Sequence, residues 1–343
     1  MRAVRPRLRD EVVTLAHGAG GKATRALVEG LFLPELDNPL LEPLGDSALL
    51  DLNGSRLAFT TDSYVVKPVF FPGGDIGELA VNGTVNDLAV AGARPLDLSA
   101  GFVLEGGFPV ADLRRVAASM AEAAAAAGVV IATGDTKVVE RGKADGLYVS
   151  TAGVGLVADG IELGPERVRP GDRVLVSGTI GDHGMAVLIA RGELELEVDL
   201  ESDTAPVHEL VAALLELGDA VRWLRDPTRG GLATALNELA RQAGLAIALD
   251  EAALALRAAV VGACEILGID PLYVANEGKL IAIVAQEAAA AALAALRSRP
   301  LGVDAAIVGE VRSDPAGLVL LQTVLGGSRI VDMLVGDPLP RIC

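Results

Sequence analysis

The sequence predicts an α/β protein made of two domains of similar size. Its 343 residues exceed the usual length of one domain, and a hydrophobic content of 51% suffices for two buried cores. Strand and helix patterns alternate through the first half, until the turn signal Pro170-Gly171-Asp172 starts a new alternation. These observations place the domain boundary near residue 165.

The first domain, residues 11–165, follows a short arm at residues 1–10 that carries arginines but no apolar run. Its strands are predicted from alternating apolar residues, and its helices from apolar residues at near-helical spacing. Gly92 and Gly128 stand where the two helices are expected to end. In order, the expected elements are a strand over 56–63, a helix over 75–93, a strand over 97–104, a helix over 110–127, and strands over 129–133 and 147–156.

The second domain, residues 166–332, begins with an apolar strand just after the turn signal. In order, its expected elements are a strand over 173–177, a helix over 184–191, an acidic surface loop or weak helix over 193–206, a helix over 230–243 and a strand over 319–325. The last segment, 333–343, contains Pro338 and Pro340, which disfavour both helix and sheet pairing. We therefore expect a mobile tail that exposes the thiol of Cys343.

The composition excludes several classes of function. The net charge of −17 disfavours a nucleic-acid or anionic-membrane binder, because phosphates would be repelled. The mean hydropathy is +0.44, yet charges and glycines interrupt the apolar stretches before the roughly 18–20 residues that a spanning helix needs. The two cysteines are too few for a disulfide framework and match no zinc spacing, which favours a reducing cytoplasm.

Five separated aspartates stand next to glycine, asparagine or a predicted strand end, where α/β proteins tend to place ligands. Oxygen ligands of this kind suit Mg²⁺, which bridges the phosphates of a nucleotide. Taken alone, each aspartate is better explained as a helix cap or turn residue. Only the set favours a metal–nucleotide site. The five residues are Asp46, Asp62, Asp87, Asp135 and Asp226.

The segment His17-Gly18-Ala19-Gly20-Gly21-Lys22 is rich enough in glycine to let backbone N–H groups approach an anion closely. A flexible turn explains the same glycines equally well. Two charged residues also stand beside apolar strands: Lys137, two residues after Asp135, and Glu277. A carboxylate there could remove a proton and a lysine could steady negative charge, although spacing alone does not distinguish them from solvated surface charges.

Taken together, these segments resemble the aminoimidazole-ribotide (AIR) synthetase superfamily. Within it, the glycine-rich start, the run Asp135 to Val139 and the ending Pro340-Arg341-Ile342-Cys343 are similar to the HypE family of hydrogenase maturation factors. The likeness extends from about residue 12 to the end, and the ending is its specific part because related families lack it. The superfamily motifs are Gly45-Asp46-Ser47, Thr61-Asp62, Asn86 to Pro95, Gly134-Asp135-Thr136 and Asp226 to Gly231.

The resemblance implies a PurM-like α/β (α+β) fold, with an N-terminal sheet domain that dimerises and ATP in the cleft between the two domains. It also implies roles for individual residues. Mg²⁺ would be held by Asp46, Asp87 and Asp226. The nucleotide would lie near His17, Gly20, Gly21, Asp46, Asp62, Asn86, Asp87, Gly134 and Asp135. The catalytic residues would be Cys343, Glu277 and Lys137.

The activity implied is ATP-dependent dehydration of an S-carbamoyl group on Cys343 to a thiocyanate. A HypF-type carbamoyltransferase would load the carbamoyl group, and a HypC–HypD complex would receive the cyanide for the iron of [NiFe] hydrogenase. Two other interpretations share the aspartate motifs. One is an ATP-dependent kinase or synthetase for a small molecule, which needs no Cys343. The other is an acidic adaptor that uses ATP only to order itself and its tail.

Overall fold

The computed structural model describes residues 8, 10–36, 38–192, 198–336, 339 and 342–343. Most of the predicted arm at 1–10 therefore lies outside the described residues, as do residues 193–197 of the predicted acidic loop. No helix in the described part of the chain is long and apolar enough to cross a membrane.

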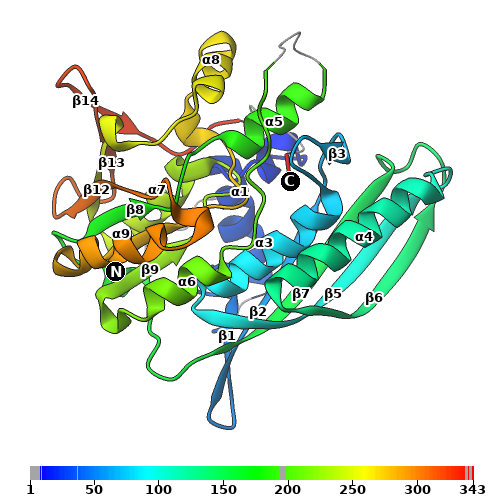
Figure 1. Ribbon diagram of the computed structural model, residues 1–343, viewed down its shortest axis with the longest axis horizontal. Coiled ribbons are helices and arrows are strands. Elements are labelled where there is room, and N and C mark those ends of the chain that lie inside the picture. The colour runs from blue at the N-terminus through cyan, green and yellow to red at the C-terminus, as the bar shows by residue number, and fades with distance from the viewer. Residues whose placement is uncertain (1–7, 9, 37, 193–197, 337–338, 340–341) are drawn as a thin grey trace.

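The N-terminal domain is a five-stranded sheet with helices α3 (Ile76–Val90) and α4 (Val110–Ala127) on one face (Figure 1). Only the β5–β6 pair is parallel, as the crossover through α4 requires. β6 is one of the two edge strands, and nine of its ten residues are exposed. The strands, in sheet order, are β1 (Ala48–Leu52), β2 (Ser55–Tyr64), β7 (Leu147–Val157), β5 (Ala93–Glu105) and β6 (Val130–Val139).

Local sequence signals explain the ends of both helices. The carboxylate of Asp75 accepts a hydrogen bond from the backbone N–H of Gly77 at 2.7 Å and so caps the first turn of α3. Gly128 adopts a left-handed φ of 67° and ends α4 at the predicted residue. The short N-terminal elements are α1 (Lys22–Leu27), α2 (Leu33–Glu35), β3 (Phe70–Phe71) and β4 (Gly74–Asp75).

The C-terminal domain is a seven-stranded mixed sheet between helices. Successive side chains of β8 point to opposite faces of this sheet: Val174 and Val176 pack with α7, whereas Leu175 packs with α6 and α9. In sheet order the strands are β14 (Ser328–Val331), β13 (Val319–Gln322), β10 (Ala246–Asp250), β12 (Ala306–Arg312), β8 (Arg173–Val176), β11 (Ile281–Val284) and β9 (Val221–Arg225). The helices are α5 (Asp182–Ala190), α6 (His208–Leu215), α7 (Gly231–Ala243), α8 (Ala258–Leu267) and α9 (Ala289–Arg297).

Helices α5 and α8 belong by sequence to the second domain but pack into the core of the first. Met185 and Val260 are fully buried in the same cluster as Leu79 of α3. Ile342 and Leu339 of the C-terminal tail join that cluster, with exposed fractions of 3% and 8%. The tail therefore ends against the junction of the two domains, where Cys343 is partly buried and less exposed than expected.

Other expectations differ from the structure in extent. β6 continues to Val139 instead of ending at Thr133, because Gly134 to Val138 keep the parallel register with β5. Lys137 therefore lies within an edge strand, not at a strand end. The predicted acidic surface loop is partly core, since Leu200 and Thr204 are buried.

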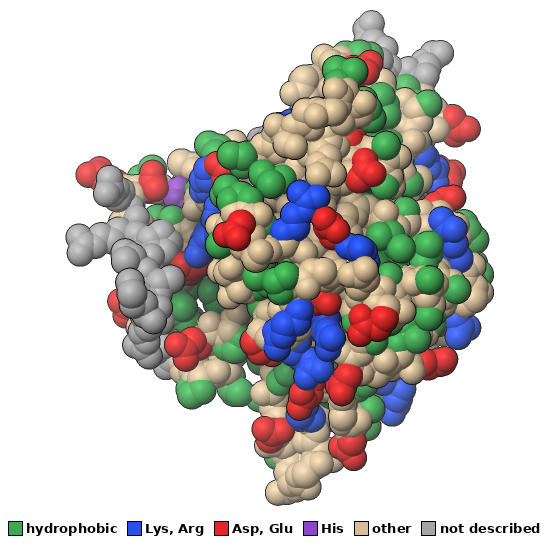
Figure 2. Space-filling view, turned by 90° about the vertical axis from the view of Figure 1, so that its left-hand side faces the viewer, with side chains coloured by type: hydrophobic (Ala, Val, Ile, Leu, Met, Phe, Trp, Pro, Cys, Tyr) green, Lys and Arg blue, Asp and Glu red, His purple; other side chains and the backbone are tan. Residues whose placement is uncertain are grey.

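Surface charges of both signs are interspersed on the face shown in Figure 2.

Candidate functional site

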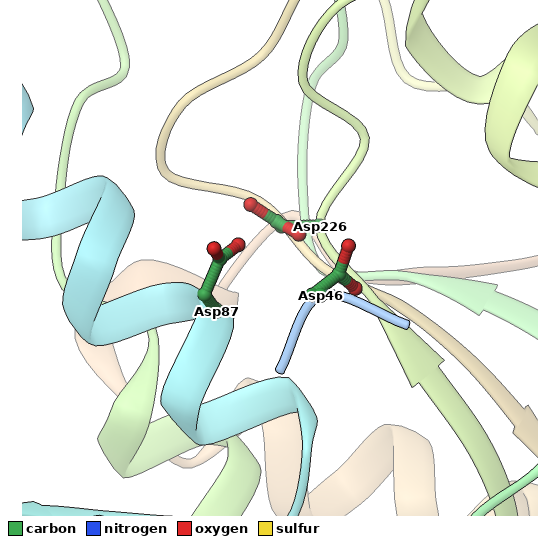
Figure 3. Close-up of side chains that lie close together, drawn as sticks. All are labelled: Asp46, Asp87 and Asp226. Carbon is green, nitrogen blue, oxygen red and sulfur yellow. The ribbon is translucent and has the colours of Figure 1, made fainter. Parts of the chain in front are cut away.

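Three carboxylates from three separate elements face one another at the junction of the domains (Figure 3). Asp46 lies in the loop before β1, Asp87 on the last turn of α3, and Asp226 directly after β9. One ligand atom of each lies within 4.8 Å of the others. Asp226 caps no helix, since α7 begins five residues later and has Gly230 at its N-cap. The structure thus brings together the three residues that the resemblance implies as metal ligands.

The electrostatics of this aspartate cluster favour a cation. Burial and then mutual repulsion raise the pKa of Asp87 well above its ordinary value, and burial with the charge of Asp46 raises the pKa of Asp226 to about 7. Asp46 is held by Arg225 at 3.0 Å, and Asp87 accepts a hydrogen bond from Thr60 at 2.8 Å. Three close carboxylates, of which Arg225 contacts one, have the charge and oxygen donors that suit Mg²⁺.

Asp62 lies on β2 between the aspartate cluster and the C-terminal thiol. Its charge raises the pKa of Asp46 on one side and those of Glu277 and Cys343 on the other. The phenol of Tyr64 donates a hydrogen bond to its carboxylate at 2.9 Å. Asp62 is therefore within electrostatic range of both groups.

The Cys343 thiol and the Glu277 carboxyl form the second part of the site. Glu277 is only 3% exposed, and burial followed by the charge of Asp226 raises its pKa well above the ordinary value. Burial raises the pKa of Cys343 to about 12; Arg229 opposes that rise, whereas the charge of Glu277 and a hydrogen bond with it add to it. The Oε1 atom of Glu277 has no protein partner among the described residues. One acceptor of the buried carboxyl is thus free beside the thiol.

A cavity of about 170 Å³ adjoins the thiol. Its wall is mostly apolar, so a small neutral group such as a carboxamide fits its character. Arg229 lies three residues after Asp226 and interacts electrostatically with Cys343. The charge of Cys343 is the largest cause that raises the pKa of Arg229. The lining includes Ser63, Val65, Arg229, Tyr273, Ile342 and Cys343.

Asn86, which the resemblance places near the nucleotide, is occupied by protein partners. Its amide nitrogen donates to the carbonyl oxygens of Ala205 and Glu277, each at 3.0 Å. Its amide oxygen accepts from the backbone N–H of Val207 at 2.7 Å. The side chain of Asn86 therefore joins α3 to two segments of the C-terminal domain, a role that a nucleotide motif does not indicate.

The glycine-rich segment packs against the C-terminal domain. A β-carbon on Gly21 would lie 2.3 Å from the carbonyl oxygen of Leu334, and one on Gly20 would lie 2.7 Å from that of Arg229. The N–H of Gly20 is already donated to Thr24 at 2.9 Å. These glycines therefore permit close approach of two backbones, and through Gly18 and Ala19 the segment forms one wall of the Cys343 cavity.

His17 orders the chain just before that wall. Its Nδ1 atom accepts a hydrogen bond from the backbone N–H of Thr14 at 3.1 Å, and its Nε2 atom lies 3.5 Å from Asp10. The ring is 5% exposed. Within one chain, the geometry therefore matches a role for His17 in ordering this loop.

Gly134, Asp135 and Lys137 are not brought to the aspartate cluster by the fold of one chain. They lie on the edge strand β6, where Lys137 forms an ion pair with Asp135 at 2.8 Å. The two side chains are 69% and 70% exposed. The structure therefore separates the predicted site residues into a buried group at the domain junction and an exposed group on β6.

Sequence reasoning missed three residues that touch the site. Arg225 directly precedes the quoted motif that begins at Asp226, and Arg229 lies within it; neither was assigned a role from the motif. His183 contacts the tail, as described below. No spacing signal marks it, because its partner is 159 residues away.

Two family models match the chain: the AIR synthase related protein N-terminal domain over residues 44–157 and its C-terminal domain over residues 169–320. Among curated relatives, the carbamoyl dehydratase HypE of Rhodobacter capsulatus is 58% identical over 98% of this chain and 99% of its own length. The HypE of Escherichia coli K12 is 49% identical over 96% and 99%.

Solved structures of HypE proteins are also similar to this chain. A HypE–HypF complex matches with a TM-score of 0.86 at 48% identity, covering 90% of this chain and all of that one. HypE in complex with ATP matches with a TM-score of 0.81 at 50% identity, covering 97% and 100%. A ThiL complex with AMPPCP and TMP, at 20% identity and a TM-score of 0.69, shares the fold.

Proposed function

This chain belongs to the HypE family of carbamoyl dehydratases within the AIR synthase related proteins, and we propose that it uses ATP to dehydrate an S-carbamoyl group on its own Cys343. The observation that carries the proposal is the position of Cys343. Its thiol lies in a cavity with Arg229 and in contact with Glu277, whose pKa responds to Asp226 of the aspartate cluster. The substrate-bearing thiol and the proposed phosphate site are therefore adjacent.

The chemistry converts the S-carbamoyl group and ATP to the thiocyanate, ADP and phosphate. The carbamoyl oxygen attacks the γ-phosphorus, and the nitrogen releases one proton. Cleavage of the C–O bond then expels phosphate as the nitrogen releases its second proton and the C≡N bond forms. Phosphorylation is needed because an amide oxygen is a poor leaving group. The protein contributes mainly positioning and charge stabilisation to the phosphoryl transfer.

Asp46, Asp87 and Asp226 are the proposed ligands of Mg²⁺, which would neutralise charge on the cluster and on the phosphates. The same cluster controls the proposed base. After burial, the charge of Asp226 is the largest cause that raises the pKa of Glu277. Neutralising Asp226 therefore favours the ionised form of Glu277, which can accept a proton from the substrate nitrogen.

Lys137 is proposed to act from a second copy of the chain. Within one chain it is exposed on β6, so dimerisation through the N-terminal sheet is a way to bring it, with Gly134 and Asp135, to a neighbouring site. Its ammonium group would stabilise charge on the departing phosphate.

Loading and release require the tail to leave the domain junction, because Leu339 and Ile342 are buried in the core there. We assign loading to a HypF-type carbamoyltransferase, in line with the HypE–HypF complex of a similar protein, and cyanide transfer to a HypC–HypD complex. The two free cysteines fit a reducing compartment, which supports the proposal that the reaction takes place in the cytoplasm.

The test is to carbamoylate the full chain with HypF and carbamoyl phosphate, add Mg-ATP, and follow the mass of the C-terminal peptide. We expect a gain of one carbamoyl group and then a loss of one water, with neither change in Cys343→Ala. Cys264→Ala is the matched control and should behave like the wild type, because Cys264 is buried on α8. ATP turnover on a small molecule with an unchanged tail would refute the proposal and support a superfamily kinase or synthetase.

A further inference from the structure

One buried histidine contacts the tail without belonging to the aspartate cluster or the thiol–carboxyl pair. His183, near the start of α5, is fully buried. Its Nε2 atom lies 2.9 Å from the backbone carbonyl oxygen of Ile342, the residue before Cys343. Its Nδ1 atom lies 2.7 Å from the hydroxyl of Ser202. The edge of Phe71 packs on the ring at 5.6 Å between centroids.

The partners determine which nitrogen carries the proton. A carbonyl oxygen can only accept, so Nε2 must donate to Ile342. Burial lowers the pKa of His183, which favours the neutral ring with a single N–H. The Nδ1 atom is then an acceptor, and the Ser202 hydroxyl donates to it. That hydroxyl also accepts from the backbone N–H of Thr204 at 3.1 Å, which fixes its orientation.

We propose that His183, oriented by Ser202, is a positioning residue that holds the tail backbone so that the Cys343 sulfur lies at Glu277. The hydrogen bond to Ile342 acts one residue from the sulfur and adds a polar contact to the apolar burial of Ile342 and Leu339. This inference rests on the proposed function and deepens it, because it names what presents the carbamoyl group to the site.

The same loop fixes the proposed base. Asp203, the neighbour of Ser202, accepts a hydrogen bond from the backbone N–H of Glu277 at 3.1 Å and pairs with Lys279 at 3.0 Å. Ser202 itself is held by its N–H, which donates to the carbonyl of Pro72 at 2.8 Å. Two adjacent residues thus position the carrier of the thiol and the backbone of the base, so a shift of this loop changes their relative geometry.

The first test needs neither ATP nor a partner protein. Cys343 is alkylated with iodoacetamide in the full chain, and the rate is read from the mass of the C-terminal peptide. His183→Leu removes the donor at similar volume, so the tail should leave the domain junction more often and alkylation should rise about three- to tenfold, the effect of one net hydrogen bond. His183→Gln can still donate to Ile342 and should stay within about twofold of the wild type.

Ser202→Ala leaves Nδ1 without its donor and allows the other tautomer, which cannot donate to Ile342; it should give an intermediate rise. His208→Leu is the matched control, since His208 lies on α6 and should leave the rate unchanged. Buried Cys264 reports unfolding in the same samples. If Cys343 alkylation is unchanged in both His183→Leu and Ser202→Ala while Cys264 stays protected, or if His183→Gln matches His183→Leu, the positioning role is overturned.

The second test uses protein already carbamoylated on Cys343. At saturating Mg-ATP, the single-turnover rate of water loss should fall about three- to tenfold in His183→Leu and recover in His183→Gln, with an unchanged KM for ATP. A fall in ATP affinity alone would contradict a role confined to the tail. Failure of the proposed function gives a different pattern, in which even the wild type loses no water although the alkylation differences persist.

Discussion

The aspartate cluster and strand β6 carry similar residues in opposite surroundings. Asp46, Asp87 and Asp226 are held at the junction of two domains and have raised pKa values, whereas Asp135 and Lys137 are about 70% exposed and neutralise each other. The first group is brought together within one chain. Among the described residues, Lys137 and Asp135 of the second group pair only with each other at the surface. The comparison teaches that the fold of one chain assembles the proposed metal end of the site, whereas the proposed lysine end would need another surface.

The largest expected effect comes from the buried group. Asp87→Asn removes one charge from the aspartate cluster and should lower ATP-dependent water loss from carbamoylated Cys343 by about 10³-fold, because phosphoryl transfer depends on charge neutralisation there. Mg-ATP binding, measured by calorimetry, should weaken in parallel. Asp51→Asn, an exposed change on β1, is the control. Wild-type turnover in Asp87→Asn would remove this residue from the mechanism.

The pH dependence of stability tests whether burial and the neighbouring carboxylates destabilise ionised Asp226 when no cation is bound. The pKa of Asp226 is about 7 in the folded chain and near 4 when unfolded, so the folded state binds the extra proton between these values. Without Mg²⁺, this residue's contribution to the free energy of unfolding should fall as pH rises from about 4 to about 7, by up to about 4 kcal/mol. Urea titrations of wild type and Asp226→Asn measure it as their difference.

That difference should shrink when Mg²⁺ is added at pH 7, because the cation relieves the repulsion that destabilises the ionised aspartate cluster. Parallel curves for the two proteins across this pH range would show that Asp226 is not strained by its neighbours.

For the exposed group, Lys137→Ala should lower water loss by about 10²-fold while leaving the melting temperature and Mg-ATP affinity unchanged. Lys143→Ala, in the exposed loop after β6, is the control. A mixture of Lys137→Ala and Cys343→Ala chains then distinguishes the two arrangements. Recovered activity means that the lysine acts on the neighbouring chain's cysteine, and absence of recovery means that it acts within its own chain.

The smallest effect concerns the glycine-rich wall of the cavity. Gly21→Ala places a methyl group 2.3 Å from the Leu334 carbonyl oxygen and should cost about 2 kcal/mol of stability, read as a lower urea midpoint. A β-carbon on Gly18 would have no atom within 4 Å, so Gly18→Ala should leave the stability unchanged. Equal stability of the two variants, with ATP affinity lost in both, would restore the interpretation as a phosphate cradle.

The sequence predicted the two-domain α/β fold, helix α4 to the residue, and the three aspartates that meet. These succeed because they rest on local signals or on quoted motifs. It could not predict the buried tail, since the contact between His183 and Ile342 spans 159 residues. The role of Asn86 was missed for the same reason: its partners are backbone atoms of distant segments, which no side-chain pattern records.

The hydrogen bonds of Asn86 constrain how the two domains can move. Asn86 precedes Asp87 on α3, and its amide group donates to the backbone of Glu277. A proposed metal ligand and the proposed base are therefore attached to the same helical turn. If the two domains rotate about each other to admit nucleotide or free the tail while this hydrogen bond is kept, the rotation axis should pass near Asn86. The interior of the site would then keep its spacing while the outer rim opens.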